Sequence, residues 1–146
     1  MFYGQYQHSM DDKGRLTIPA IYRDALEGTV FITQGFDKNL MLMPSSYFEW
    51  LSGQINKLNI VDPNARLIRR LFLSTAFPVE VDKAGRLLMP PHHRAYFDGE
   101  PEMILVGQSQ YIELWKPAHW NEQLANLGDT DGNIGRFAGL DLSMKE

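Results

Sequence analysis

The chain contains the same short pattern twice, 71 residues apart. Residues 11 to 19 read Asp-Asp-Lys-Gly-Arg-Leu-Thr-Ile-Pro, and residues 82 to 90 read Asp-Lys-Ala-Gly-Arg-Leu-Leu-Met-Pro. A further arginine follows each copy at the same spacing, at Arg23 and Arg94. The shared residues stay in register over the whole pattern, which composition alone would not produce. The chain is therefore predicted to consist of two copies of one unit.

A weaker similarity follows each pattern. Residues 31 to 35 align with residues 103 to 107, and residues 40 to 42 align with residues 112 to 114. Apolar runs of this length, separated by short polar loops, are typical of strands. We therefore expect two strands in each unit, at about 30–35 and 39–43 in the first and about 102–107 and 111–115 in the second.

The repeated pattern itself predicts a tight hairpin that leads into a short strand. Gly14 and Gly85 supply the positive φ that such a turn requires. Side chains then alternate between the two faces of the strand, so Arg15 and Arg86 are expected to point away from the core. The residues expected to point into the core are Leu16, Ile18, Leu87 and Met89.

Helix signals follow each hairpin. Pro19 and Pro90 suit the first turn of a helix and Gly28 and Gly99 suit its end, which predicts short helices at about 19–27 and 90–98. Longer helices are predicted from a capping box at Ser46–Glu49 to about Leu58, from Asp62-Pro63 to about Thr75, and from Pro117 through Trp120, Leu124 and Leu127.

These elements divide the chain into four parts. They are a first repeat with its following helix (1–60), a linker helix (61–76), a second repeat with a C-terminal helix (77–127) and a flexible, glycine-containing tail (128–146). Neither repeat is long enough to bury its strands alone. We therefore expect a strand-rich α+β fold, in which two intertwined strand-helix-strand-strand repeats form one pseudo-twofold barrel with flanking helices.

Composition excludes several classes of protein. The chain has no cysteine, which excludes disulfides, thiolate catalysis and zinc sites with sulfur ligands. It has neither an apolar run of spanning length nor a signal-peptide pattern, so we expect a soluble intracellular protein without a membrane partner. The net charge is −4, but residues 1 to 97 carry 11 basic and 9 acidic side chains whereas residues 98 to 146 carry 3 and 9. Any surface that binds nucleic acid must therefore be local.

The chain resembles the MraZ family of bacterial transcriptional regulators. The similarity rests on the Met1-Phe2 start with Gly4, the two Asp-x-x-Gly-Arg patterns, and Leu-Val-Gly-Gln at residues 105 to 108, and it extends to about residue 127. Gly-Arg-Leu-x-x-Pro with a following arginine is more distantly similar to the SpoVT–AbrB regulators. That likeness implies an AbrB-like swapped-hairpin barrel, here with both halves in one chain.

The resemblance implies a function. It implies a sequence-specific DNA-binding transcriptional regulator of the division and cell-wall gene cluster, cytoplasmic and associated with the nucleoid. Such a protein binds short direct repeats of double-stranded DNA in its promoter and assembles into ring-shaped homo-oligomers. By the same resemblance, the DNA-facing hairpins carry Asp11 with Arg15 and Asp82 with Arg86. Neither a cofactor, nor a metal, nor a small-molecule substrate is expected.

Each residue of the two hairpins has a possible role. Arg15 and Arg86 either read guanine through two hydrogen bonds or only pair with their own aspartates. Asp11 and Asp82 are expected to accept backbone N–H groups and to orient the arginines. Lysines beside the arginines are natural phosphate contacts, although an exposed lysine can simply be solvated. The two lysines are Lys13 and Lys83, which lie one position apart in the two patterns. The turn glycines Gly14 and Gly85 are also expected to belong to the DNA-binding surface.

The remaining basic and aromatic residues favour structural roles. An ion pair across the two halves is expected for Arg23 and Arg94, and a solvated or bridged helix face for Arg66, Arg69 and Arg70. Adjacent histidines diverge on a helix, so His92 and His93 are not expected to share a metal. Packing or subunit contact, not base stacking, is expected for Phe48, Trp50, Tyr111, Trp115 and Trp120.

Two other functions are alternatives to a DNA-binding regulator. One is a non-enzymatic protein-interaction barrel, antitoxin-like or a ring scaffold, whose arginines dock an acidic partner; the acidic composition favours it slightly. The other is a hydrolase that uses Asp11, Asp82 and histidines. It has poor support, because neither a catalytic triad, nor a metal signature, nor a phosphate loop is present. We therefore expect a protein that is not an enzyme.

Overall fold

The computed structural model describes residues 1–142, and the two repeats form corresponding elements. The first repeat contains β1 (Gln5–Ser9), β2 (Arg15–Thr17), α1 (Ala20–Arg23), η1 (Asp24–Leu26), β3 (Thr29–Gln34) and β4 (Leu40–Pro44). The second contains β5 (Phe77–Glu80), β6 (Arg86–Leu88), α4 (Pro91–Arg94), η2 (Ala95–Phe97), β7 (Glu102–Gly107) and β8 (Ile112–Trp115). Helices α2 (Ser45–Asn56) and α3 (Pro63–Leu73) join the repeats, and α5 (Pro117–Leu127) and α6 (Thr130–Phe137) follow the second.

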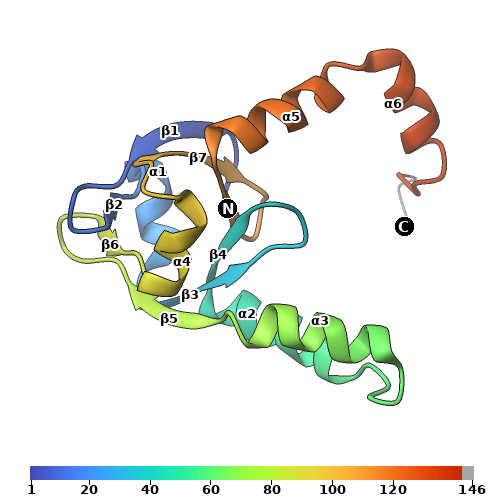
Figure 1. Cartoon of the computed structure of the whole chain (residues 1–146), viewed down its shortest axis with the longest axis horizontal. Coiled ribbons are helices and arrows are strands. Elements are labelled where there is room, and N and C mark those ends of the chain that lie inside the picture. Colours follow the sequence, from blue (N-terminus) through green and yellow to red (C-terminus); the bar gives the residue numbers. More distant parts are fainter. Residues whose placement is uncertain (143–146) are drawn as a thin grey trace.

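The repeats exchange their first strands. The main sheet has the antiparallel order β1-β7-β8-β4-β3-β5, so that β1 pairs with the second repeat and β5 pairs with the first. Strands β2 and β6 pair with each other, and the bridges Met10–Leu16 and Val81–Leu87 connect this pair to β1 and β5. The strands thus close into the intertwined α+β barrel that the sequence predicts (Figure 1).

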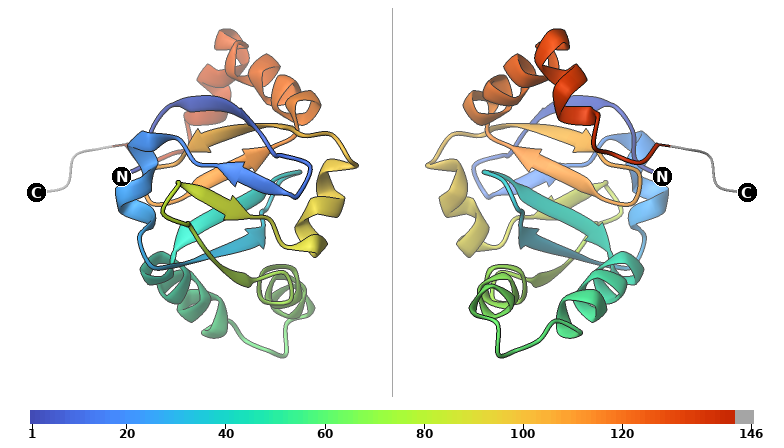
Figure 2. Two further views of the ribbon diagram at one scale, coloured as in Figure 1. Left: turned by 90° about the vertical axis from the view of Figure 1, so that its left-hand side faces the viewer. Right: turned by 90° about the vertical axis from the view of Figure 1, so that its right-hand side faces the viewer.

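A pseudo-twofold axis relates the two halves. It passes between Leu16 and Leu87, which face each other where β2 pairs with β6, and between Met41 and Glu113, where β4 pairs with β8. The left-hand view of Figure 2, in which the β2–β6 pair faces the viewer, shows α1 and α4 on opposite sides and α2–α3 and α5 on opposite outer faces. The four hairpin residues expected in the core, Leu16, Ile18, Leu87 and Met89, are all fully buried.

The structure shifts one sequence alignment by a residue. Val30 pairs with Val79 and Met103 pairs with His8, so Met103 is the counterpart of Val30 and not of Phe31. The reason is that residues 100 and 101 lengthen the connection after Gly99 relative to the one after Gly28. Matching Phe31 to Met103 was therefore wrong, although residues 40 to 42 and 112 to 114 correspond as predicted.

Helix boundaries also differ from expectation in two places. The capping box at Ser46–Glu49 does not form: α2 begins at Ser45 after Pro44, without a side-chain cap. The part beyond Gly128, expected to be a flexible tail, contains α6, capped by the carboxylate of Asp129, which accepts the N–H of Gly132. Residues 143–146 of that expected tail lie outside the described residues. The cap after Asp62-Pro63 forms as predicted, with Asp62 accepting the N–H of Asn64 at 2.8 Å.

Helices α2 and α3 cover the outer face of the first repeat. Met41 and Met43 of β4 are buried there against Ile55 of α2 and Phe72 of α3. Trp115 and Trp120 are buried on the second repeat as expected, whereas Trp50 stacks on Tyr47 and is 56% exposed. Within residues 1–142, the structure contains no helix both long and apolar enough to span a bilayer.

Candidate nucleic-acid interface

The first repeated pattern forms a hairpin with a glycine bulge. The N–H of Gly14 donates to the carbonyl of Asp11 at 3.0 Å, and the N–H of Asp11 donates to the carbonyl of Arg15 at 2.9 Å. Gly14 adopts φ +79°, the left-handed conformation that closes a three-residue loop of this type. The local sequence therefore determines where the turn lies and makes Arg15 the first residue of the strand that follows it.

The carboxylate of Asp11 organises this loop. Its Oδ1 accepts the N–H groups of Lys13 and Arg15, both at 2.9 Å, and its Oδ2 accepts Nε of Arg15 at 2.7 Å. These backbone hydrogen bonds, chiefly that of Arg15, and the Arg15 side chain lower the pKa of Asp11 below its usual value. The aspartate thus fixes both the backbone and the side chain of the arginine.

The second hairpin repeats this arrangement. Asp82 accepts the N–H groups of Ala84 and Arg86 at 2.9 Å each, and accepts Nε of Arg86 at 3.3 Å. The backbone hydrogen bond from Arg86 is the main cause that lowers the pKa of Asp82. The side-chain contact is longer than the 2.7 Å of the first hairpin, so the two arginines are not held equally.

The arginines can pair with their aspartates and still face solvent. Each uses Nε for the aspartate, and within residues 1–142 their terminal nitrogens have no hydrogen bond in the structure. The side chains of Arg15 and Arg86 are 33% and 39% exposed. A guanidinium bound through Nε keeps its outer pair of N–H groups, which is the pair that can bind O6 and N7 of guanine.

The two hairpins lie side by side and present one surface. In the β2–β6 pair Arg15 is opposite Leu88 and Thr17 is opposite Arg86, while Leu16 and Leu87 point into the barrel. All four outer residues therefore share one face at one end of the molecule (Figures 1 and 2). Leu88 is exposed there, and the exposed Lys13 and Lys83 lie in the adjoining loops.

The second arginine of each repeat lies against the hairpin of the other repeat. A Cβ on Gly14 would stand 2.2 Å from Cζ of Arg94, and one on Gly85 would stand 2.3 Å from Nε of Arg23. Arg23 and Arg94 donate from Nε to the carbonyls of Ile18 and Met89, each at 3.0 Å. The prediction that these arginines form ion pairs was wrong, because among residues 1–142 neither Arg23 nor Arg94 has an acidic partner.

This packing changes the local charge. The segments 11–15 and 82–86 carry four basic and three acidic residues, and Arg23 and Arg94 raise the difference from +1 to +3. The chain as a whole carries −4. The hairpin segments and their two supporting arginines thus carry a net charge of +3, and the acidic Glu100 and Glu80 lie beside Arg94 and Leu88. A contact across the two halves was expected for Arg23 and Arg94, but the repeat pattern held no signal that each would pack against the turn glycine of the other repeat.

The other candidate residues lie elsewhere. Arg66 donates to the carbonyls of Ile60 and Val61 and closes the turn before α3. His93 is buried, and its Nε2 lies 2.7 Å from the carbonyl of Thr75, while His92 is exposed. Among the described residues, no group of three or more histidine, cysteine or acidic side chains could hold a metal ion.

Comparisons with known proteins match this architecture. A profile of the family described as "MraZ protein, putative antitoxin-like" matches residues 1–71 and 72–132, one match for each repeat. The protein named Transcriptional regulator MraZ of Thermomicrobium roseum is 44% identical over 93% of this chain and 96% of its own length. Proteins of the same name from Roseiflexus sp. and Herpetosiphon aurantiacus are 40% and 39% identical, over 94% and 88% of this chain and 94% and 90% of their own.

Proposed function

The chain belongs to the MraZ family, and we propose that it is a transcriptional regulator that binds double-stranded DNA through its two arginine hairpins. The observation that carries the proposal is the pair of guanidinium groups, each held by an aspartate, on one exposed face. The names of its relatives support regulation of transcription. The protein is not an enzyme in this proposal, and it requires neither a cofactor nor a small-molecule substrate.

The β2–β6 pair fits the major groove of B-DNA, which admits a two-stranded ribbon. Arg15 and Arg86 each contact guanine O6 and N7 with their outer N–H groups, a contact worth about 1–3 kcal/mol of base discrimination. Lys13 and Lys83 contact phosphates and position the ribbon without reading sequence. Gly14 and Gly85 close the turns that present these side chains to the duplex, while Asp11 and Asp82 hold the arginines in place.

One copy makes too few contacts for tight binding. Six basic side chains at the hairpin end give a weak interaction at physiological salt, so several copies must bind together. We propose that copies associate head to tail in a ring and bind successive direct repeats in the promoter, because repeats in one direction require neighbours in one orientation. By family resemblance, the target is the division and cell-wall gene cluster, and the protein acts in the cytoplasm at the nucleoid.

Fluorescence anisotropy with the DNA upstream of the chain's own gene tests the proposal. Arg15→Ala and Arg86→Ala should each weaken binding about 10-fold or more, and the double variant should lose sequence preference. Arg70→Ala, an exposed arginine on α3, is the matched control and should bind like the parent protein. Unchanged affinity in the folded double variant would refute the proposal.

A second candidate is a protein-interaction barrel whose arginines dock an acidic partner. The net charge of −4 favours it, because it opposes unspecific attraction to DNA. The two functions differ in their dependence on salt and sequence. Binding that weakens steeply with salt and prefers the upstream region to random DNA supports the regulator, and the absence of that preference supports the interaction barrel.

A further inference from the structure

The pseudo-twofold symmetry fails at one place on the outer surface. In the first repeat, α2 and α3 together cover the sheet, and Phe72 of α3 stacks on Phe48 of α2 with ring centroids 5.6 Å apart. In the second repeat α5 is the counterpart of α2, but α6 does not return to the sheet as α3 does. It extends away from the barrel instead (Figure 1).

The uncovered place is a groove of about 430 Å³ beside α5. Its lining includes Gln5, Val106, Glu113, Trp115, Trp120 and Leu127. The counterparts of several of these residues contact α3 or pack under it in the first repeat, since Glu113 corresponds to Met41, Trp115 to Met43 and Trp120 to Phe48. The groove thus occupies the position that Phe72 and Ile68 fill in the first repeat.

The exposed fractions of corresponding residues show that no counterpart of α3 packs over this face of the second repeat within residues 1–142. Ile55 near the end of α2 is 4% exposed, whereas its counterpart Leu127 on α5 is 59% exposed. The polar side chains that line the groove already have hydrogen-bond partners. Glu113 accepts hydrogen bonds from Asn39, Gln108 and Trp115, and Trp120 donates to Gln5. What the groove lacks is an apolar helix face.

Helix α6 carries such a face and leaves most of it exposed. Ile134 and Phe137 lie three residues apart, on the same side of the helix, and are 70% and 52% exposed. The first repeat uses an aliphatic and an aromatic side chain for the same purpose, at Ile68 and Phe72. The exposed apolar surface of α6 therefore matches the chemistry of the missing cover.

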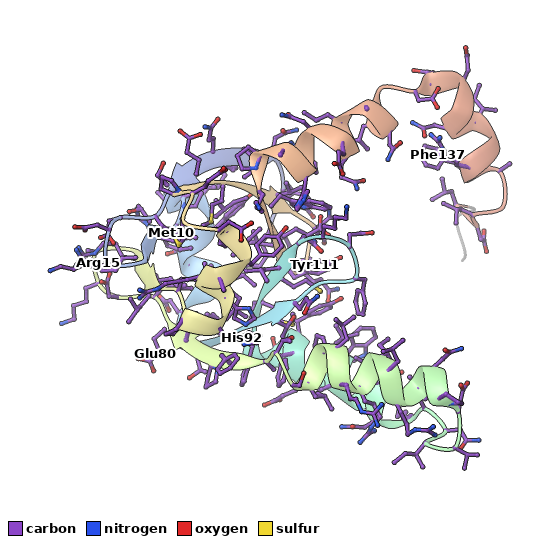
Figure 3. All side chains as sticks on the ribbon, viewed as in Figure 1. Met10, Arg15, Glu80, His92, Tyr111 and Phe137 are labelled. Atoms are coloured by element: carbon purple, nitrogen blue, oxygen red, sulfur yellow. The ribbon has the colours of Figure 1, made fainter. Side chains whose placement is uncertain are left out.

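Helix α6 does not reach the groove of its own chain. Asn133 donates to the carbonyls of Asn126 and Leu127 at the end of α5, and Arg136 pairs with Asp129. These contacts hold the corner between α5 and α6 open. The corner keeps Phe137 at the opposite end of the molecule from Arg15 (Figure 3).

We propose that α6 of one copy fills the groove beside α5 of a second copy, with Ile134 and Phe137 in the role of Ile68 and Phe72. The inference rests on the self-association in the proposed function and names its contact. The donor helix and the acceptor groove are different surfaces, so the contact is heterologous, the type of contact that forms a ring when the rotation between neighbours closes. The β2–β6 surface stays free of it, because it lies at the other end of the barrel (Figure 1).

Cysteine crosslinking tests the contact directly, because the chain has no cysteine of its own. One copy carries Gln123→Cys in the groove and a second, of different tag, carries Phe137→Cys on α6. Oxidation of the mixture should give the mixed disulfide dimer, whereas Glu49→Cys on α2 with Phe137→Cys should not. Absence of the mixed dimer, or its equal formation with the Glu49→Cys control, would overturn the proposal.

Light scattering separates this contact from self-association in general. The parent protein should have a mass several times 16.8 kDa, and Ile134→Asp with Phe137→Asp should reduce it to the monomer. Leu67→Asp is the matched control, because Leu67 is 64% exposed on α3 outside the contact. Retained mass in the α6 variant overturns this inference but not the ring, whereas a monomeric parent protein overturns both.

Discussion

The guanidinium of Arg94 lies directly against Gly14, with Cζ only 2.2 Å from where a Cβ of residue 14 would stand. Arg23 has the same relation to Gly85. The two residues of each pair belong to different repeats, and both glycines are buried although they lie in turns. Each arginine hairpin is thus supported from beneath by the other half of the molecule.

Alanine at either turn glycine should therefore destabilise the fold for two reasons, the positive φ and the clash with the arginine of the other repeat. Gly14→Ala forces a side chain into the left-handed region and displaces Arg94, which together should lower the free energy of unfolding by about 2–4 kcal/mol. Gly28→Ala is the control, because its φ is +81° but nothing lies near its Cβ, and it should cost about 1–2 kcal/mol. Urea unfolding measures both, and equal losses would show that the Arg94 contact contributes nothing.

Thr33→Val should stabilise the protein. Thr33 is fully buried, and its hydroxyl has no hydrogen-bond partner among the described residues, while its counterpart in the second repeat is Val106. Removing an unsatisfied buried hydroxyl should raise the free energy of unfolding by about 1–3 kcal/mol. The reverse change, Val106→Thr, should lower it, and a thermal melt in which both variants move the same way would contradict this reasoning.

The hairpins should lose their aspartate hydrogen bonds in acid. The pKa of Asp11 and of Asp82 is lowered in the folded protein, so the folded state favours the carboxylate. Their contribution to stability is therefore complete above the unfolded pKa of 3.8 and is lost as pH falls through the lower folded value. An NMR titration of the Lys13 and Arg15 amides should show a midpoint below pH 3.8. A midpoint above that pH would contradict the assignment.

The two hairpins should respond unequally to loss of the carboxylate charge. Nε of Arg15 is 2.7 Å from Asp11, whereas Nε of Arg86 is 3.3 Å from Asp82. Asp11→Asn should therefore shift the Nε–H resonance of its arginine more than Asp82→Asn does. Equal shifts would indicate that the difference in distance does not persist in solution.

His93 should make stability depend on pH near neutrality. Burial lowers its pKa below 6.5, against the opposing hydrogen bond to Thr75. The unfolded chain then binds more protons than the folded one below pH 6.5, so stability falls as pH drops from 6.5 towards the folded pKa, by at most about 1.4 kcal/mol per pH unit. His93→Gln should reduce this slope between pH 7.5 and 5 in urea unfolding, and an unchanged slope would exclude His93 as its source.

Short-range features followed from the sequence because the interacting groups are close along the chain. Asp11 and Arg15 are four residues apart, so the hairpin, its glycine and the outward arginine could be predicted from the pattern alone. The same holds for the alternation that buries Leu16 and Leu87 and for the cap at Asp62. Beyond Gly128 the local pattern was insufficient, because Asp129 caps α6 and Asn133 donates to Asn126 of α5 where the glycines had suggested no helix.

Repetition in the sequence determined that the molecule has two equivalent halves, each with an aspartate-held arginine at a turn. Only the tertiary structure decided that Arg94 supports Gly14, that Met103 corresponds to Val30, and that α3 covers one repeat while the other keeps a groove. These relationships join residues that are distant along the chain. They depend on how strands and helices close around a shared core, and local conformational preferences do not carry that information.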